Sequence, residues 1–212
     1  MIVWHVDDLK ASHKELRMLK QFAAQLNDEF GRETPISKSY GKIHDYLGMT
    51  LDYSKSGEVQ ITMRDYIKLI LHDVPDDMEG VAATPAGNHL FKVNEDNPEL
   101  LTGEKKEIFV HIVMQLLYLS QRARPDIQTA VLFLCGRLNK PDTDNYKKTA
   151  QVIKYLRGTL DLPLVLRSDG SGIVRWWVDA SFAVHPDMKG IQVEHCPLAR
   201  DRFTAHQRNR SW

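Results

Sequence analysis

Two adjacent aspartates near the start of the chain are the residues best suited to carry out chemistry. Asp7 and Asp8 directly follow a short apolar strand that we expect over residues 2–6. Neighbouring carboxylates in a tight turn repel each other, and a bound cation relieves that repulsion. Mg²⁺ binds one or two carboxylates and neutralises charge in two-metal phosphoryl transfer. The pair therefore indicates a phosphoryl-transfer site, although most Asp-Asp pairs in surface turns are only turns.

Charge is distributed unevenly along the chain, although the formal net charge is zero. Residues 1–83 hold 10 basic and 14 acidic side chains, whereas residues 104–160 hold 10 basic and 5 acidic ones. A carboxylate-rich half beside a basic half suits a protein that binds metal ions and phosphates. Taken alone, this uneven distribution of charge is explained equally well by ordinary solvated helix faces.

The hydrophobic pattern predicts the elements that position these residues. We expect a helix from Ser12, an N-cap that forms a capping box with Glu15, to a stop at Gly31. The apolar residues of this helix recur at a spacing that covers one face. Strands are expected over residues 43–53 and 58–62, separated by a four-residue turn.

The second part of the chain reads as mainly helical. The elements expected there are a short helix over 64–71, helices near 104–121, 125–138 and 142–158, and strands over 162–166 and 173–179. Residues 73–103 are rich in Pro, Gly and Asn and show no period, so they predict a long connection between subdomains. Residues 191–212 show no sustained period of 2 or 3.6 and predict a poorly ordered tail.

Composition restricts the class of protein. Apolar residues make up 42% and charged residues 26% of the chain, which is typical of a globular protein. No apolar run approaches the roughly 18 residues that a membrane helix needs, and no signal peptide is recognisable. The two cysteines, Cys135 and Cys196, lie far apart in dissimilar surroundings. We therefore expect an intracellular protein of the cytoplasm or nucleus, without membrane partners.

The residues around the aspartate pair resemble a signature of reverse transcriptases. His5-Val6-Asp7-Asp8-Leu9 is similar to the Tyr-Val-Asp-Asp-hydrophobic element of these enzymes, and six further segments follow in the order and spacing of copia-type retrotransposon polymerases. These segments are Phe30-Gly31, Tyr46-Leu47-Gly48-Met49, Ile61-Thr62-Met63-Arg64-Asp65-Tyr66-Ile67, Ala83-Thr84-Pro85, Leu117-Tyr118-Leu119-Ser120 leading into Arg124-Pro125-Asp126-Ile127, and Ile153-Lys154-Tyr155-Leu156-Arg157-Gly158-Thr159. The resemblance covers residues 2–189.

The resemblance implies an α+β fold built from parts of a polymerase. In chain order, these parts are the C-terminal part of a palm (1–72), a connection (73–103), a helical thumb (104–160), the start of a ribonuclease H-like domain (161–190) and an unmatched tail (191–212). A palm without its other strands would leave an edge and an apolar face uncovered. The thumb helices are expected to fold independently.

Site residues are carried over by the same resemblance. Asp7 and Asp8 would be metal-binding catalytic residues of the polymerase, and Asp179 would be the first metal-binding aspartate of the ribonuclease H domain. Leu47 and Gly48 would lie in the primer-grip turn. The basic thumb residues expected to contact the primer–template are Arg122, Arg124, Lys147, Lys148, Lys154 and Arg157. The parent enzyme would use Mg²⁺ and bind the backbone of an RNA–DNA or DNA duplex.

Departures from the family pattern bear on activity. A third polymerase aspartate is expected on a strand before Met1, and the sequence after Gly190 is unlike the family where further ribonuclease H carboxylates should stand. His5 replaces the family's tyrosine, and Met114 replaces a small glycine on a thumb helix. We therefore expect a truncated chain that binds Mg²⁺ weakly and is inactive by itself. The alternatives are a non-enzymatic nucleic-acid-binding module that uses the basic thumb, and a subunit completed in trans by the missing N-terminal part of a polymerase.

Overall fold

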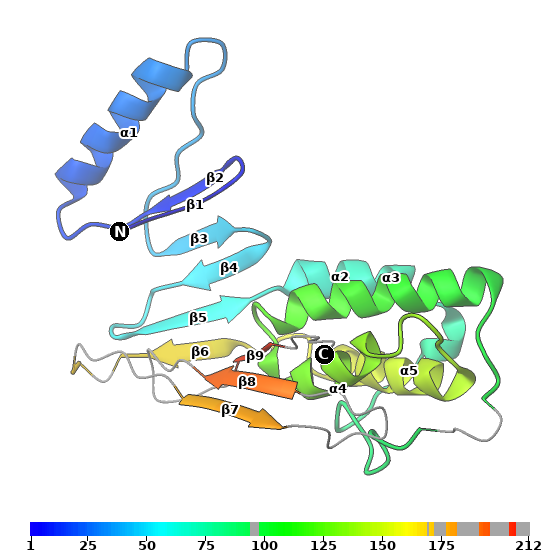
Figure 1. Cartoon of the computed structure of the whole chain (residues 1–212). Coiled ribbons are helices and arrows are strands. Elements are labelled where there is room, and N and C mark those ends of the chain that lie inside the picture. Colours follow the sequence, from blue (N-terminus) through cyan, green and yellow to red (C-terminus); the bar gives the residue numbers. More distant parts are fainter. Residues whose placement is uncertain (94–97, 169, 172–176, 182–190, 196–203, 207–212) are drawn as a thin grey trace.

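The fold is of the α+β class that the sequence predicts (Figure 1). The computed structural model describes residues 1–93, 98–168, 170, 171, 177–181, 191–195 and 204–206, the last three ranges by their backbone. The elements are β1 (Ile2–His5), β2 (Asp8–Ala11), α1 (Leu16–Phe30), β3 (Ile43–Tyr46), β4 (Met49–Asp52), β5 (Glu58–Thr62), α2 (Arg64–Asp73), η1 (Asp76–Met78), α3 (Gly103–Ser120), η2 (Pro125–Ile127), α4 (Gln128–Cys135), α5 (Thr143–Gly158), β6 (Leu164–Arg167), β7 (Trp177–Ser181), β8 (Ile191–His195) and β9 (Thr204–His206).

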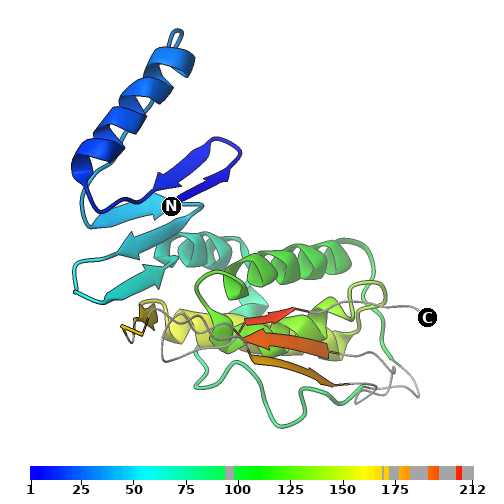
Figure 2. The same ribbon diagram turned by 60° about the vertical axis from the view of Figure 1, so that its left-hand side comes forward.

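The N-terminal part extends away from the helices that hold the core (Figures 1 and 2). It consists of the separate β1–β2 hairpin and α1, a helix in which no residue is fully buried. Large apolar side chains here face solvent, including Trp4 at 75% and Phe30 at 73% exposure. The uncovered apolar surface expected for this part of the chain is therefore present.

The start of α1 differs from the prediction. Glu15, not Ser12, occupies the N-cap position, and its side chain makes no capping hydrogen bond. The Ser12 N–H instead donates to the Met1 carbonyl at 2.8 Å, which continues the ladder of the β1–β2 hairpin. The predicted capping box is wrong because the hairpin uses Ser12. Gly31 ends the helix as expected, with its N–H on the Asn27 carbonyl.

A four-stranded antiparallel sheet runs in the order β3-β4-β5-β6. The strand predicted over 43–53 is divided into β3 and β4 by a turn. Strand β6 pairs with β5 over Glu58↔Arg167 to Ile61↔Leu164. The segment predicted to open a ribonuclease H-like domain at residue 161 thus begins with a strand, Leu164–Arg167, that joins the sheet of the N-terminal half. Buried Leu164 favours this pairing.

The β5–β6 pair contains an acid-sensitive ion pair. Arg167 Nε donates to Glu58 Oε2 at 2.9 Å, and this bond, followed by hydrogen bonds from Gln60 and Lys55, lowers the pKa of Glu58 to about 2. A carboxylate with a lowered folded-state pKa stabilises the fold above its ordinary value of 4.5. That contribution is lost as the pH falls from there toward about 2.

We expect Glu58→Gln to lower the thermal midpoint near neutral pH and to have a much smaller effect at about pH 3, where Glu58 of the wild type is losing its advantage. Thermal unfolding followed by circular dichroism at both pH values measures this difference. Equal effects of the substitution at both values would contradict the role of the carboxylate charge.

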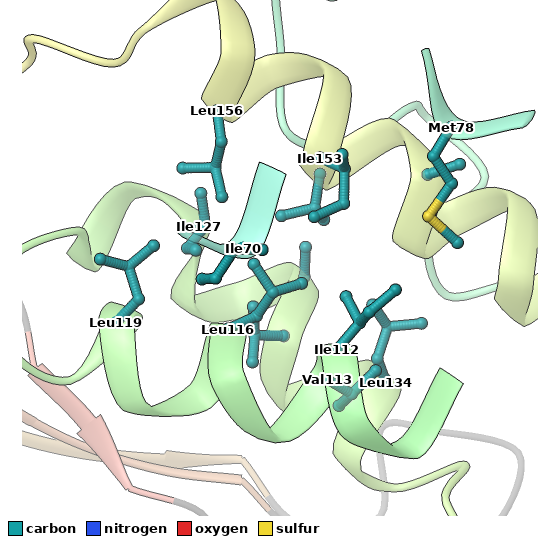
Figure 3. Packing of buried hydrophobic residues seen from close by; sticks show 14 of the residues in the cluster. Ile70, Met78, Ile112, Val113, Leu116, Leu119, Ile127, Leu134, Ile153 and Leu156 are labelled. Carbon is teal, nitrogen blue, oxygen red and sulfur yellow. The ribbon is translucent and has the colours of Figure 1, made fainter. Parts of the chain in front are cut away.

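The hydrophobic core lies among the four helices α2, α3, α4 and α5 (Figure 3). The three predicted helical segments of residues 104–158 are confirmed, with α4 beginning as the short η2 turn at Pro125. Asp142 caps α5 in a capping box with Asn145. Ile70 and Met78, which precede the predicted thumb, are fully buried in the same core. Within the described residues, every helix is too short or too polar to cross a lipid bilayer.

The connection over residues 73–103 lies along α5 through a series of hydrogen bonds. The Ala82 N–H donates to the Lys154 carbonyl at 3.2 Å, and the Gln151 side chain donates to the Thr84 carbonyl at 2.9 Å. The connection is hydrogen-bonded to both the backbone and the side chains of α5. It therefore packs with α2, α3, α4 and α5 as one unit, here called the helical unit, and is not a free linker.

The C-terminal strands form a third antiparallel sheet in the order β7-β8-β9. The predicted strand over 173–179 overlaps β7, while residues 172–176 lie outside the described part of the chain. β8 and β9 fall in the segment predicted to be a poorly ordered tail. Residues 191–195 alternate apolar and polar types, and this period of 2 fits the observed pairing of Val193 with Asp179.

Candidate nucleic-acid interface

Asp7 and Asp8 lie at the tip of the β1–β2 hairpin. His5 pairs with Asp8, so Val6 and Asp7 form a two-residue loop, and Val6 has a φ of 48°. The Trp4 indole N–H donates to the Val6 carbonyl and fixes the loop. Both aspartates are exposed. The hairpin therefore presents two adjacent carboxylates to solvent, as the sequence predicted for a tight turn between strands.

The carboxylate pair is a poor fit for the Mg²⁺ ions implied by the resemblance. Two ions held in one site need a bridging ligand, and Mg²⁺ demands near-ideal octahedral geometry. Within the described part of the chain, no three His, Cys, Asp or Glu side chains gather closely enough to hold a metal ion. Asp7 and Asp8 by themselves do not make a two-metal site, and no reaction step follows from them.

Leu47 and Gly48 form the two-residue turn between β3 and β4. Tyr46 pairs with Met49, and the φ angles of Leu47 and Gly48 are 52° and 72°. Two consecutive positive φ angles give the turn whose twist matches antiparallel strands. For Leu47 this left-handed conformation costs about 1–2 kcal/mol. The predicted turn is present, and it stores strain at a residue that is not glycine.

Tyr118 of α3 contacts this turn. Its hydroxyl donates to the Leu47 carbonyl at 3.0 Å. The Tyr66 ring lies 5.3 Å from the Tyr118 ring, and the Arg122 guanidinium lies 3.6 Å from the Tyr118 ring centroid. Burial and the neighbouring Tyr118 raise the pKa of Tyr66, while Arg122 opposes them. Among the residues predicted for the site, Leu47 and Arg122 are therefore brought together through Tyr118, which lies in a segment that resembles the family but to which the resemblance assigned no role.

Arg124 is buried rather than available to a ligand, with 1% exposure. Its guanidinium donates to both carboxylate oxygens of Asp126, at 2.8–3.2 Å, and to the Thr159 carbonyl at 2.9 Å. The Tyr155 hydroxyl also donates to Asp126 at 2.9 Å. Burial raises the pKa of Asp126, but the hydrogen bonds and charge of Arg124 outweigh it and leave that pKa below its ordinary value. This network joins η2 to the end of α5.

Lys148 is also buried and internally paired. Its ammonium group donates to the Lys92 carbonyl at 2.6 Å and lies 2.7 Å from an Asp144 carboxylate oxygen. It also lies 4.8 Å from the centre of the Phe133 ring. The side chain is only 5% exposed, so in this structure it holds the connection on α5 and does not face a phosphate backbone.

The other three predicted basic residues differ in exposure. Lys147 is exposed and Lys154 half-buried, and they lie seven residues apart on one face of α5. Arg157 is half-buried, and its guanidinium donates to the carbonyls of Met78 at 2.9 Å and Gly80 at 2.8 Å. Lys147 and Lys154 are therefore the α5 side chains best placed to meet a phosphate.

Asp179 lies at the centre of β7, where it pairs with Val193 of β8. The structure describes only the backbone here. The antiparallel β7–β8 pair gives Asp179 a strand position, and nothing further follows about ligands.

No model of a known protein family matches the chain, and no solved structure matches it. The chain is similar to a protein of transposon Ty5-1 from Saccharomyces cerevisiae, with 26% identity over 187 residues, which is 87% of this chain and 58% of the yeast protein. It is also similar to the mitochondrial protein AtMg00810 of Arabidopsis thaliana, with 24% identity over 182 residues, or 86% of this chain and 71% of that protein. The chain thus spans little more than half the length of its yeast relative.

Proposed function

We propose that this chain is a retrotransposon-derived fragment of an RNA-directed DNA polymerase, which comprises the end of the palm, the thumb and the start of the ribonuclease H domain. The observation that carries the proposal is Asp7-Asp8 at the tip of a β-hairpin, followed along the chain by the tight Leu47–Gly48 turn. Similarity to a protein of a yeast transposon supports a retrotransposon origin. Asp179 on the first strand of the C-terminal sheet fits the start of a ribonuclease H domain.

The exposed face of α3 supports a contact with nucleic acid. Met114 is 48% exposed and lies one turn before Tyr118, on the same face of the helix. The resemblance puts Met114 where a thumb helix approaches a duplex, and the Leu47–Gly48 turn lies beside Tyr118. The exposed Met114 on α3 and Lys147 and Lys154 on α5 are the proposed duplex-contacting residues, here called the duplex-binding surface. It also favours the second candidate, a nucleic-acid-binding module without enzymatic activity.

We expect the chain to bind duplex nucleic acid without extending a primer. Fluorescence anisotropy of a labelled RNA–DNA primer–template, titrated from low to physiological salt, should show binding that weakens steeply with salt. Primer extension with Mg²⁺ and deoxynucleotides should give no product, because Asp7 and Asp8 lack a third carboxylate among the described residues. Extension by the purified chain that is abolished in Asp7→Asn would overturn the proposal of inactivity.

The basic surface is tested by charge reversal. Lys147→Glu combined with Lys154→Glu should reduce the slope of log affinity against log salt by about one for each phosphate that the chain no longer neutralises. Lys38→Glu is the matched control, since Lys38 is exposed and lies outside the helical unit. Equal losses of affinity per reversed charge in the two variants would mean that only overall charge matters, and no binding at low salt would remove the duplex-binding surface.

A further inference from the structure

We propose that Tyr118 is a positioning residue that holds the Leu47–Gly48 turn against α3 in the orientation that meets the end of a bound primer. The inference rests on the proposed function, because only a polymerase-derived chain has a primer end to bind. Its geometric basis is the hydrogen bond of 3.0 Å from the Tyr118 hydroxyl to the Leu47 carbonyl.

The turn requires an external support. It connects β3, an edge strand, to β4, and Leu47 is held at a positive φ that costs conformational energy. The Leu47 carbonyl lies in the loop and takes no part in the strand pairing that ends at Tyr46↔Met49. A hairpin tip of this kind is mobile unless other elements contact it. Tyr118 supplies such a contact from a helix that packs in the core.

Tyr118 is itself fixed by two neighbours. The Arg122 guanidinium lies 3.6 Å from the Tyr118 ring centroid and donates to the Tyr118 carbonyl at 3.3 Å. Arg122 therefore contacts both the ring and the main chain of Tyr118. Tyr66 of α2 packs against the ring at 5.3 Å. Helix α2 directly follows β5, which belongs to the same sheet as the β3–β4 turn. The contacts of Tyr118 therefore join this sheet, α2 and α3 beside the turn.

This arrangement explains a role for Arg122 other than binding phosphate directly. A guanidinium stacked on an aromatic ring keeps its charge while its position is restricted. Arg122 therefore orients Tyr118, and Tyr118 orients the turn. Removing the tyrosine hydroxyl frees the turn but leaves the charge of the duplex-binding surface unchanged.

The experiment compares two nucleic acids. One is an RNA–DNA primer–template with a recessed DNA 3′ end, and the other is the same duplex closed by loops at both ends. Anisotropy at low salt gives the ratio of the two affinities for the wild-type chain, for Tyr118→Phe and for Tyr66→Phe. The last variant removes a hydroxyl from the same aromatic pair but keeps the bond to Leu47. Hydrogen exchange of the 43–52 segment is measured in parallel, without nucleic acid.

We expect the wild type to prefer the recessed end. Tyr118→Phe should reduce that preference about two- to tenfold, the effect of one hydrogen bond, and the ratio cancels any change in affinity that the two nucleic acids share. It should also speed exchange at the turn, whereas Tyr66→Phe should change neither quantity. A purely structural role would alter thermal stability without altering the ratio.

Three results would overturn the inference. An unchanged ratio and unchanged exchange in Tyr118→Phe would show that the hydrogen bond does not position the turn. Equal wild-type binding to both nucleic acids would show that the turn meets no primer end, while the proposed duplex-binding surface would stand. Failure of the folded wild type to bind either nucleic acid would remove that surface, and the inference with it.

Discussion

Replacing Arg124 with alanine lowers the free energy of unfolding by about 3–5 kcal/mol, the cost of breaking a buried ion pair from one side. The substitution leaves the Asp126 carboxylate and the Thr159 carbonyl without the guanidinium that bonds them at 2.8–3.2 Å. It also empties the space of a side chain that is 1% exposed. Chemical unfolding in guanidinium chloride or urea, followed by circular dichroism, measures the change in the free energy of unfolding.

Arg64→Ala is the matched control for this prediction. Arg64 pairs with Asp161 at 3.1 Å, but the two side chains are 55% and 71% exposed. Surface ion pairs of this kind contribute about 0–1 kcal/mol, because water and salt screen them. Similar costs for the two substitutions would show that burial of Arg124 does not determine its contribution.

The Arg124 network also has a pH dependence with a defined sign. The folded-state pKa of Asp126 is below its ordinary value of 3.8. Its contribution to stability is therefore complete above that value and is lost as the pH falls below it. Glu58 loses its contribution to stability in the same acidic range. Measuring the acid dependence of stability in Arg124→Ala, which lacks the partner of Asp126, separates the contribution of Glu58 from that of Asp126.

The helical elements were the part of the fold most accessible from sequence. Pro125 and Pro141 mark where helices can begin but not continue, and the observed η2 and α5 begin at or just after them. Composition also located the turn at residues 54–57, where Gly57 has a φ of 74°, whereas the turn at residues 47–48 was expected only from the family resemblance. Local physical rules determine the helix starts and the turn at residues 54–57, so a local reading of the sequence finds them.

The predicted roles of the basic residues show where local reading fails. Arg124 and Lys147 look alike in sequence, because both are cations near the end or start of a helix. Their burial depends on distant partners: Thr159 accepts from Arg124, whereas no comparable partner draws Lys147 into the core of the described residues. Lys148 is likewise held by the carbonyl of Lys92, in the connection. Counting charges over residues 104–160 therefore overestimated the cationic surface.

Competition between alternatives explains the other differences. Ser12 is a residue type that favours the N-cap position of a helix, but its N–H bonds to Met1 in the β1–β2 hairpin instead. Strand β6 was grouped with the segments that follow it, yet its partner is β5, about 100 residues earlier in the chain. The contact between Tyr118 and Leu47 cannot be read from local sequence, because the helix and the turn lie 71 residues apart in the chain.

The helical unit depends on residues outside the predicted thumb, so residues 104–160 expressed alone should not fold cooperatively. Ile67, Ile70 and Met78 precede this segment and are 0–1% exposed in the shared core. Full burial of one such side chain contributes about 1.5–3 kcal/mol, so three contribute about 5–9 kcal/mol. That sum is comparable with the whole stability of a domain, about 5–15 kcal/mol. The independent folding expected from the sequence therefore conflicts with the packing.

A fragment covering residues 58–168 is the matched control, because it keeps α2, the connection and the β5–β6 pair as well as α3, α4 and α5. Thermal unfolding by circular dichroism should be sigmoidal for this fragment. For residues 104–160 it should be broad or absent, since the helices would keep local propensity but lack the surfaces they pack against. A sharp, reversible transition in the shorter fragment would show that the three side chains are dispensable and that the helices form a domain of their own.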